Sequence, residues 1–363
     1  MRPQTRGTSR SGTSTSSEPV AKVVFITQQV DPAHPALAAT VPKLRALAEL
    51  VDEVVVLADG AADDVLPANC RVRTFRARRK IGRGLRFEAA LALELRGLRS
   101  GAVIAHMCPI YAVLAAPLVR PFGVPLVLWF THWRGSRLLQ AAERASTAVT
   151  SVDERSFPIA SRKVNAIGHG IDLTEFPCSP PREGAGIRLL SLGRYSTAKG
   201  LDVVLAAVAL AGADVELRVH GPSLSDDERA HRSELEHVSR DLGLDGRVVL
   251  GDAVPRSELP SLFADHDALV NNMRAGAPDK VVYEAAAGCL PVLASNPIFD
   301  SLLDRDQRFP RTDPRALADR IRAMGEMGAA ERAAVGQRLR ERVAEGHSVQ
   351  SWARGILDAA GLP

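Results

Sequence analysis

The sequence predicts an α/β protein with two parallel-sheet domains, and three observations lead to this prediction. The chain has 363 residues, about twice the length of an ordinary domain. Short apolar runs rich in β-branched residues alternate with Ala/Leu-rich helical patterns from residue 22 almost to the end. A segment rich in Pro, Gly and charge, CSPPREGAG (178–186), divides these runs into two series and has the composition of an interdomain linker.

The apolar runs predict nine strands. They lie at residues 22–27, 53–58, 102–106 and 125–130 in the first series and at 187–193, 215–219, 247–250, 267–271 and 291–294 in the second. Nearly continuous apolar strands that alternate with helices indicate parallel sheets covered on both faces. We therefore expect two Rossmann-like domains that face a crevice, with ligands at the carboxyl ends of the strands.

The predicted organisation has five parts. Residues 1–20 hold nine Ser or Thr and no apolar stretch, which is typical of a disordered tail. The first domain covers 21–178, the linker 179–186 and the second domain 187–345, and a C-terminal helix at 346–363 around Trp352 can return to the first domain. We expect domain closure about the linker.

Composition excludes several classes of protein. With 46% hydrophobic residues, the chain is neither disordered nor collagen-like. Its four cysteines, Cys70, Cys108, Cys178 and Cys289, are scattered without a CxxC pair, which argues against a disulfide framework or a structural zinc site and favours the reducing cytoplasm. No run of 18 apolar residues suggests a membrane span.

The segment LLSLGRYSTAKGLDVVLAAVALA (189–211) contains the most informative loop. A predicted strand ends at Gly193, the loop carries Arg194 and Lys199, and Gly200 opens an amphipathic helix. Two cations and free backbone N–H groups at a helix N-terminus favour a phosphate, and a guanidinium with an ammonium suits a diphosphate. The alternative is that both cations are solvated loop residues.

A second segment, DALVNNMRAGAPDKVVYEAAAGCLPVLAS (267–295), leads from a strand through a polar loop to a helix that bears Glu284. A carboxylate there can accept hydrogen bonds from a sugar diol, as acidic residues do in dinucleotide sites. The alternative is a Glu that only compensates the helix dipole.

In order along the chain, several segments resemble family 4 of the GT-B glycosyltransferases, which are retaining enzymes. They are GHGIDLTEFPC (168–178), GRYSTAKGLD (193–202), GDAVPRSELPSLFADHDALV (251–270), DKVVYEAAAGCLPVLAS (279–295) and TDPRALADRI (312–321). The resemblance is strong over roughly 165–345. It implies a nucleotide-diphosphate-sugar donor on the C-terminal domain and an acceptor on the N-terminal domain.

The resemblance also implies roles for single residues. Arg194 and Lys199 would stabilise the diphosphate leaving group, and Glu284, the second Glu of the E-x7-E motif, would hold the donor ribose. The first Glu of that motif falls at Gly276, so it is absent, and Pro278 removes a backbone donor from the same loop. Residues that we also assign to the donor site are Gly193, Gly221, Gly276, Asp279 and Lys280, of which Asp279 and Lys280 are the nearest replacements for the missing Glu.

In the first half of the chain, AHMCPIYAVLAAPLVRPFGVPLVLWFTHW (105–133) resembles the family's acceptor-side block. His132 matches the histidine that reaches the transferred sugar, although a lone His at a strand end is more often structural. Trp133 and Arg134 follow directly and are candidates for acceptor contact. The first loop, 27–40, is expected on the acceptor side.

The predicted activity is retaining transfer of a hexose-type sugar to an acceptor hydroxyl, with no metal and no cofactor beyond the donor. Asp265 with Asp267, and Asp304 with Asp306, have Asp-x-Asp spacing, but the first pair begins a strand and the second lies in an Arg-flanked loop, so both are interpreted as incidental. The alternative, favoured by Gly276, is a non-catalytic regulatory protein that binds nucleotide sugars. A GT-B epimerase fits less well, because the matched segments belong to family 4.

Charge is divided unevenly along the chain. Residues 21–180 carry a net charge of +6 and residues 181–363 a net charge of −4. Eight cations and no acid lie in RVRTFRARRKIGRGLRF (71–87), where Arg79, Arg83 and Arg86 share a face if the segment is helical. This run favours docking to an anionic acceptor, lipid-linked or otherwise, or to the inner face of a membrane, with a solvated charged face as the alternative. Nucleic acid is not expected, because aromatic residues do not interleave with the cations.

Overall fold

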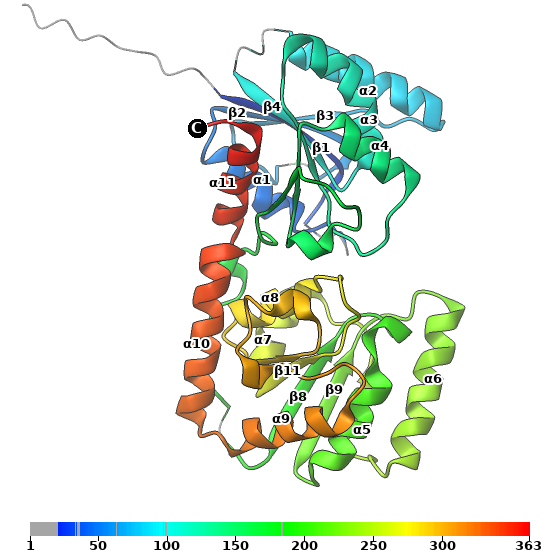
Figure 1. Ribbon diagram of the computed structural model, residues 1–363, viewed down its shortest axis with the longest axis vertical. Helices are drawn as coiled ribbons and strands as arrows, with labels where there is room; N and C mark the ends of the chain where they lie inside the picture. The colour runs from blue at the N-terminus through cyan, green and yellow to red at the C-terminus, as the bar shows by residue number, and fades with distance from the viewer. Residues whose placement is uncertain are drawn as a thin grey trace, which may run out of the picture.

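The computed structural model describes residues 21–363 except 33, 35, 36, 63, 97, 99 and 183. The predicted tail at 1–20 and part of the first loop lie outside the described residues. Two α/β domains are stacked one above the other, each with a parallel sheet between helices (Figure 1). The predicted fold class is therefore confirmed.

The N-terminal sheet has seven parallel strands in the order β3-β2-β1-β4-β5-β6-β7. Their bounds are β1 (Lys22–Val30), β2 (Glu53–Ala61), β3 (Cys70–Thr74), β4 (Gly101–His106), β5 (Leu126–Trp129), β6 (Ala148–Ser151) and β7 (Val164–Ala166). Strands β3, β6 and β7 were not predicted, because none is a continuous apolar run. Arg71 in β3 instead bonds Glu53 and Glu94, which places a charged strand at the sheet edge.

Both faces of this sheet are covered. Along β1, Val23 and Phe25 belong to one apolar cluster and Val24 and Ile26 to another, as the two-residue period of a strand requires. The helices of this domain are α1 (Thr40–Ala48), α2 (Lys80–Leu95), α3 (Pro109–Val119) and α4 (Arg137–Ala145), with the 3-10 helices η1 (Arg120–Phe122), η2 (Glu154–Ser156) and η3 (Leu173–Glu175).

The C-terminal sheet has five parallel strands in the order β10-β9-β8-β11-β12. They are β8 (Ile187–Leu192), β9 (Val215–His220), β10 (Val248–Gly251), β11 (Ala268–Asn271) and β12 (Val292–Ala294). The helices are α5 (Leu201–Ala211), α6 (Asp226–Asp241), α7 (Leu259–Ala264), α8 (Lys280–Ala287), α9 (Pro314–Glu326) and α10 (Ala329–Gly346), with η4 (Thr197–Lys199), η5 (Arg256–Glu258), η6 (Pro297–Phe299) and η7 (Arg305–Gln307). All five strands coincide with predicted ones, since each is an apolar run.

The chain passes between the domains at two adjacent segments. Ile171 donates its N–H to His347 O over 2.7 Å, and Val349 donates its N–H to Ile171 O over 2.9 Å. Gly168, at φ +77°, lies so close that a Cβ there would be 1.9 Å from Gly346 O, so only glycine fits this crossing.

The last helix, α11 (Val349–Ala360), packs on α1 of the N-terminal domain. Figure 1 shows α10 rising along the C-terminal domain and α11 continuing onto the N-terminal one. Trp352 is fully buried, and the Lys43 ammonium lies 4.9 Å from the centre of its ring. The chain's last helix therefore completes its first domain.

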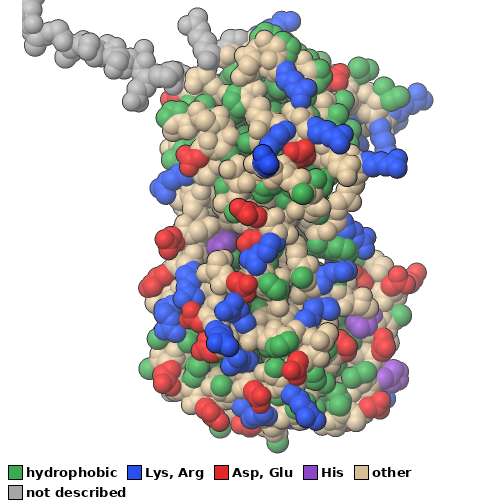
Figure 2. Space-filling view, in the orientation of Figure 1, with side chains coloured by type: hydrophobic (Ala, Val, Ile, Leu, Met, Phe, Trp, Pro, Cys, Tyr) green, Lys and Arg blue, Asp and Glu red, His purple; other side chains and the backbone are tan. Residues whose placement is uncertain are grey.

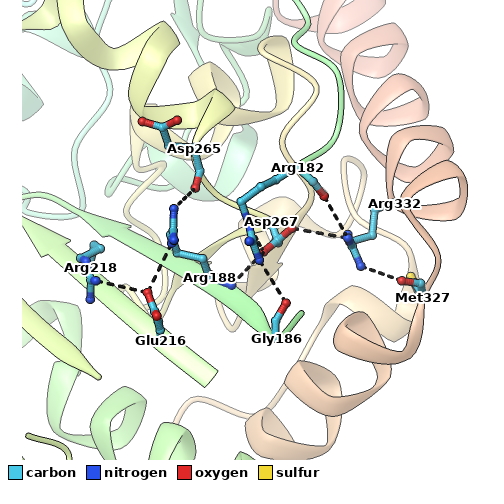
Figure 3. Close-up of polar contacts among 9 residues, drawn as sticks. All are labelled: Arg182, Gly186, Arg188, Glu216, Arg218, Asp265, Asp267, Met327 and Arg332. Atoms are coloured by element: carbon cyan, nitrogen blue, oxygen red, sulfur yellow. Dashed lines mark hydrogen bonds and ion pairs between the residues drawn. The ribbon is translucent and has the colours of Figure 1, made fainter. Parts of the chain in front are cut away.

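The segment at 178–186 lies against the C-terminal domain and is fixed there by a buried carboxylate (Figure 3). Asp267, whose side chain is 1% exposed, accepts a 2.7 Å bond from Arg182 of this segment. It also accepts the backbone N–H of Arg188 over 2.8 Å, and Arg332 of α10 lies 3.5 Å away. Asp267 therefore joins the linker, β8 and α10.

One expectation about the cysteines is wrong. The sequence argued against disulfides, but the structure pairs Cys178 with Cys289 across a separation of 111 residues, with the two Cα atoms 5.0 Å apart. The spacing in the sequence did not indicate this pair, because the two cysteines meet only when the segment at 178 folds back onto the end of α8. Cys70 and Cys108 are free.

The basic run is part strand and part helix. Arg79 is the N-cap of α2, and Arg83 is paired with Asp59 at 2.9 Å. Arg86 donates to Arg76 O over 2.6 Å while remaining exposed. Lys and Arg side chains gather at the upper right of Figure 2, over the N-terminal end of α2. No helix within the described part of the chain is both long and apolar enough to cross a bilayer.

Candidate active site

Lys199 lies at the carboxyl edge of the C-terminal sheet. Its side chain is almost buried, and the ammonium donates to Leu192 O over 2.6 Å. Gly193, at φ +125°, leaves it room, because a Cβ there would lie 2.4 Å from Nζ. A Cβ on Gly221 would likewise lie 1.9 Å from Gly193 O. The two predicted glycines thus let strands β8 and β9 end against each other beside the lysine.

Asp279 is the carboxylate partner of Lys199. It is the N-cap residue of α8, and its Oδ2 atom accepts hydrogen bonds from the Lys199 ammonium and from Asn271 Nδ2, the latter at 2.7 Å. The structure therefore brings Gly193, Lys199, Gly221 and Asp279 into one cluster. In this arrangement Asp279 holds the lysine at the place where an anion is expected.

Arg194 stands apart from that cluster and is more accessible. Its side chain is 59% exposed and lies 3.2 Å from Glu228 of α6. Exposed ion pairs of this kind are weak, so the guanidinium can exchange Glu228 for another anion at little cost. The predicted pair of cations therefore consists of a buried ammonium and an exposed guanidinium on one loop.

Glu284 is buried on α8, and its carboxylate is paired with two basic side chains. Lys280, one turn earlier, lies 2.7 Å from its Oε1 atom, and Arg256 of η5 bonds the same oxygen. Burial alone raises the pKa of Glu284, but Lys280 and Arg256 together bring that pKa below its ordinary value. The carboxylate is therefore ionised and oriented before any ligand arrives.

The loop before α8 contacts the N-terminal domain. Gly276, at φ +78°, lies where a Cβ would be 3.8 Å from Trp133 Cβ. The guanidinium of Arg274 lies 4.4 Å from the centre of the Trp133 ring, and that of Arg134 lies 4.3 Å from it. Asn296 shapes this loop by donating to the carbonyls of Arg274 and Ala277, both over 2.9 Å. The predicted acceptor-side Trp133 thus meets the donor-side loop.

His132 precedes this tryptophan and is exposed. Its Nδ1 atom accepts the backbone N–H of Arg134 over 2.9 Å, and its ring stacks on Trp133 with the centroids 5.5 Å apart. The accepting Nδ1 leaves Nε2 to carry the proton of the neutral ring. His132 can therefore present a donor from the N-terminal side.

A cavity of about 210 Å³ opens beside the lysine cluster. Its wall contains Leu192, Gly193, His220, Gly221, Pro222, Ala253, Val254, Leu259, Asp279 and Val281. These residues come from the ends of β8, β9 and β10, from the segments that follow them and from the starts of α7 and α8. The apolar side chains of this wall suit a flat ring, and the Lys199 ammonium, bonded to Leu192 O and Asp279 of the wall, suits an anion attached to that ring.

Two buried basic groups lie near the N-terminal strands. Burial, with the nearby charge of Lys43, lowers the pKa of His106 well below its usual range, and both its ring nitrogens are buried without a hydrogen-bond partner. Burial, with the nearby charge of Lys280, lowers the pKa of Lys43 as well. Both groups are therefore weaker bases in the folded chain than in water.

The Asp-x-Asp pairs have other partners. Asp267 is bound by arginines as described, and Asp304 lies 2.7 Å from Arg342. Within the described ranges, no group of three or more His, Cys, Asp or Glu side chains is placed to hold a metal ion.

Several residues of the site were not predicted. Asn271 and Asn272 follow β11 at the carboxyl edge of the sheet, so the rule on strand ends could have found them. Arg311 donates to Asn272 O over 3.2 Å and to Ala198 O over 3.0 Å, which fixes the loop that carries Lys199. No sequence pattern distinguishes Arg256 or Arg274 from the many other arginines of the chain.

Comparisons with known proteins show what the chain is similar to. Residues 186–326 match the family model described as "Glycosyl transferases group 1". The fold is that of solved GT-B glycosyltransferases, so the expected resemblance is confirmed at the level of the GT-B fold. The family match and the fold together support a transferase of sugars. No curated protein sequence matches the chain.

Solved structures match almost the entire chain at low identity. HepE of Anabaena, solved in complex with UDP, has a TM-score of 0.74 at 17% identity and covers 94% of this chain and 99% of its own. Sucrose-phosphate synthase of Thermosynechococcus elongatus has a TM-score of 0.70 at 16% identity, with coverage of 93% and 98%. WaaG, a glycosyltransferase involved in lipopolysaccharide biosynthesis, has a TM-score of 0.60 at 17% identity, with coverage of 93% and 98%.

Proposed function

We propose that this protein is a family 4 retaining glycosyltransferase that moves a hexose-type sugar from a nucleotide-diphosphate donor to an acceptor hydroxyl. The observation that carries the proposal is the buried Lys199 ammonium at the end of β8, with Arg194 on the same loop and a cavity beside it. A buried cation and an exposed one at this edge suit a diphosphate, whose negative charge grows as it leaves. HepE, which has the same fold, was solved with UDP and with UDP-glucose.

The proposed reaction needs no protein base. The bond between the sugar's anomeric carbon and the diphosphate oxygen breaks while the acceptor oxygen bonds to the same face of that carbon. The acceptor's proton passes to the leaving diphosphate oxygen, so charge and atoms balance. Lys199 and Arg194 stabilise the developing anion, and His132 approaches the transferred sugar from the N-terminal domain.

Sugar recognition is assigned to the loop around Gly276, where the family's first Glu is missing. Trp133 and Arg274 are stacked at this position, and the nearby carboxylate of Asp279 is bonded to Lys199. When a diphosphate replaces Asp279 as the partner of the Lys199 ammonium, the Asp279 carboxylate becomes available to accept hydrogen bonds from sugar hydroxyls. Lys280 stays with Glu284, which we assign to the donor ribose.

The test is a panel of UDP-, GDP- and ADP-sugars, first for thermal stabilisation and then for turnover with the tightest binder. We expect one donor to stabilise the protein and to be consumed with an acceptor or water. An Arg194→Ala protein that responds to the donor as strongly as the wild type contradicts the diphosphate assignment. Binding without turnover in any condition favours the alternative, a regulatory nucleotide-sugar-binding protein.

No metal or cofactor beyond the donor is expected, because Lys199 and Arg194 supply the positive charge that a cation would bring. We therefore expect turnover to survive treatment with EDTA. Activity that disappears with EDTA and returns with Mg²⁺ or Mn²⁺ contradicts this part of the proposal.

A lipid-linked or otherwise anionic acceptor, met at the inner face of the cytoplasmic membrane, is proposed from the surface of α2. Ile81 and Leu85 on this helix are 81% and 62% exposed, and they line a groove of about 530 Å³ together with Ile110 and Leu114 of α3. Exposed Lys80 flanks these apolar side chains. Apolar insertion combined with basic residues suits an anionic bilayer.

Vesicle flotation tests this surface. We expect the protein to float with vesicles that contain phosphatidylglycerol and not with pure phosphatidylcholine. An Ile81→Glu/Leu85→Glu protein should lose flotation, and Leu224→Glu, at an equally exposed position of the C-terminal domain, should retain it. Equal flotation of the two variants contradicts membrane docking through α2.

A further inference from the structure

Arg256 connects the buried carboxylate of the donor site to the segment that follows the interdomain crossing. One arm of its guanidinium bonds Glu284 of α8, and the other bonds Glu175 at the end of η3. The guanidinium also lies 5.2 Å from the centre of the Phe176 ring. Three contacts therefore fix a side chain that belongs to the short helix η5.

The other end of this connection is itself rigid. The carbonyl of Phe176 accepts a 2.5 Å bond from Arg340 of α10, and the Phe176 ring packs on Phe263 of α7, with centroids 5.9 Å apart. Arg340 also donates to the carbonyl of Leu173, at the start of η3, over 3.3 Å. Glu175 is thus held on the C-terminal domain, four residues after Ile171 pairs with His347 and Val349 at the crossing.

The effect on Glu284 follows from where the cations bond. Arg256 and Lys280 both bond Oε1, so the carboxylate is held through one oxygen and its rotation is limited. The other oxygen, Oε2, then has a set direction. A charge-assisted hydrogen bond is both strong and directional, so loss of Arg256 would leave the carboxylate on Lys280 alone, whose flexible stem orients it less well.

We infer that Arg256 is a positioning residue: held by Glu175, it orients the Glu284 carboxylate so that Oε2 accepts the ribose hydroxyls of a nucleoside diphosphate. This inference rests on the proposed function, because the ribose is assigned to Glu284 there. The inference adds Arg256, which does not contact the donor. Through Glu175, this residue links ribose recognition to the segment beside the interdomain crossing.

The experiment compares each nucleotide with its 2′-deoxy counterpart. Binding of UDP and dUDP, GDP and dGDP, and ADP and dADP is measured by calorimetry, and the tightest pair is followed. The wild type should bind the ribonucleotide about tenfold more tightly, as one hydrogen bond to a charged acceptor implies. Arg256→Gln should bring this ratio close to one, and Arg256→Lys should restore part of it.

Two further variants separate positioning from folding. Arg188→Gln, which removes a surface ion pair with Glu216 in the same domain, should keep the wild-type ratio. Glu175→Gln leaves the contact between Arg256 and Glu284 in place but releases the other arm, so it should lower the ratio about threefold. If Arg256→Gln does not fold, Glu175→Gln decides.

The inference is overturned if Arg256→Gln keeps the wild-type ratio of ribonucleotide to deoxynucleotide affinity. If Arg256→Gln does not fold, the same result in Glu175→Gln overturns it. In either case, nucleotide binding by the wild-type protein still upholds the proposed function. If no nucleotide binds the wild-type protein, the proposed function fails and the role of Arg256 fails with it. A variant that is less stable yet keeps the ratio shows a purely structural Arg256.

Discussion

Lys199 and Gly193 illustrate how one backbone position controls a functional side chain. The buried ammonium passes over Gly193 and bonds Leu192 O and Asp279. Because a Cβ at Gly193 would lie only 2.4 Å from Nζ and 2.5 Å from Cε of Lys199, the glycine is needed for the lysine's position as much as for the backbone turn. The two residues are therefore expected to act as one unit in anion binding.

Gly193→Ala should weaken nucleoside diphosphate binding about tenfold, because the methyl group displaces the Lys199 ammonium and the φ of +125° is strained for alanine. Calorimetric titration measures the change. Gly243→Ala is the matched control, since φ there is +66° and no atom lies within 4 Å of the added Cβ. Equal affinities of the two variants would contradict a positional role for Gly193.

For single residues, the sequence predicted members of the site where a family motif or a strand end marks the residue. Gly193, Lys199 and Glu284 were predicted on those grounds, and the structure places the first two beside the carboxyl end of β8 and Glu284 on α8. Arg256 was not predicted, because its partners Glu175 and Glu284 are 81 and 28 residues away. Long-range partners of a charged side chain leave no local pattern.

Among the elements, the segment at 178–186 is held by a buried carboxylate in addition to the disulfide between Cys178 and Cys289. Asp267 lies just before β11, yet its bonds reach Arg182 on the linker and Arg332 on α10 (Figure 3). Removing one partner from a buried ion pair leaves the other charges uncompensated. The position of the linker on the C-terminal domain is therefore expected to depend on this side chain.

Asp267→Asn should lower the free energy of unfolding by about 3 kcal/mol, because Arg182 and Arg332 remain without their counter-ion. Urea denaturation followed by circular dichroism measures it. Asp265→Asn, two residues earlier and exposed, should change the stability by less than about 0.5 kcal/mol. The interpretation of Asp267 is wrong if both variants unfold at the same urea concentration.

Elements were predictable from sequence in proportion to their apolar content. The strands β1, β2, β4 and β5 are buried runs and were predicted, whereas β3 was hidden by its arginines. Strand β7 has only three residues, and its side chains are partly or fully exposed. Such a strand is specified by its neighbour β6 and not by its own composition.

The helix α11 should contribute strongly to the stability of the N-terminal domain. Trp352→Ala should lower the free energy of unfolding by about 4 kcal/mol, since it removes a fully buried ring between α1 and the sheet. Thermal unfolding monitored by circular dichroism measures the change. Gln350→Ala, at an exposed position of the same helix, should leave the melting temperature nearly unchanged; a comparable fall in both variants would contradict this packing role.

For the whole molecule, the two domains share polar and apolar contacts along one side. The crossing segments pair at Ile171 and Ser348, and Arg155 lies 3.5 Å from Asp300 across the interface. One apolar cluster extends from Val23 of β1 to Val292 of β12. The sequence predicted that the C-terminal helix can return to the first domain, but it did not show the contacts of this junction, because they join segments that are far apart along the chain.

Histidines at this junction should make the molecule sensitive to acid. Burial lowers the pKa of His347 to about 4, and burial, with Lys43, lowers that of His169 well below its usual range. The folded chain then binds fewer protons than the unfolded chain, so stability is full above about pH 6.5 and is lost as the pH falls from 6.5 towards 4.

Urea unfolding at pH 7 and pH 5 measures this loss. His347→Gln should lose less stability between the two pH values than the wild type, because one of the titrating groups is gone. His237→Gln, at an exposed position of α6, should lose as much as the wild type. The same pH dependence in all three proteins would contradict a role for His347.

The return of α11 to the N-terminal domain has a consequence for synthesis. On a ribosome the first domain of a chain ordinarily folds while the second is still being made. Here the face of β1 that contains Val23 and Phe25 shares its core with Trp352 and Ile356. The domain that is synthesised first can therefore bury that face only after α11 has emerged, so its assembly is completed after the second domain has been made.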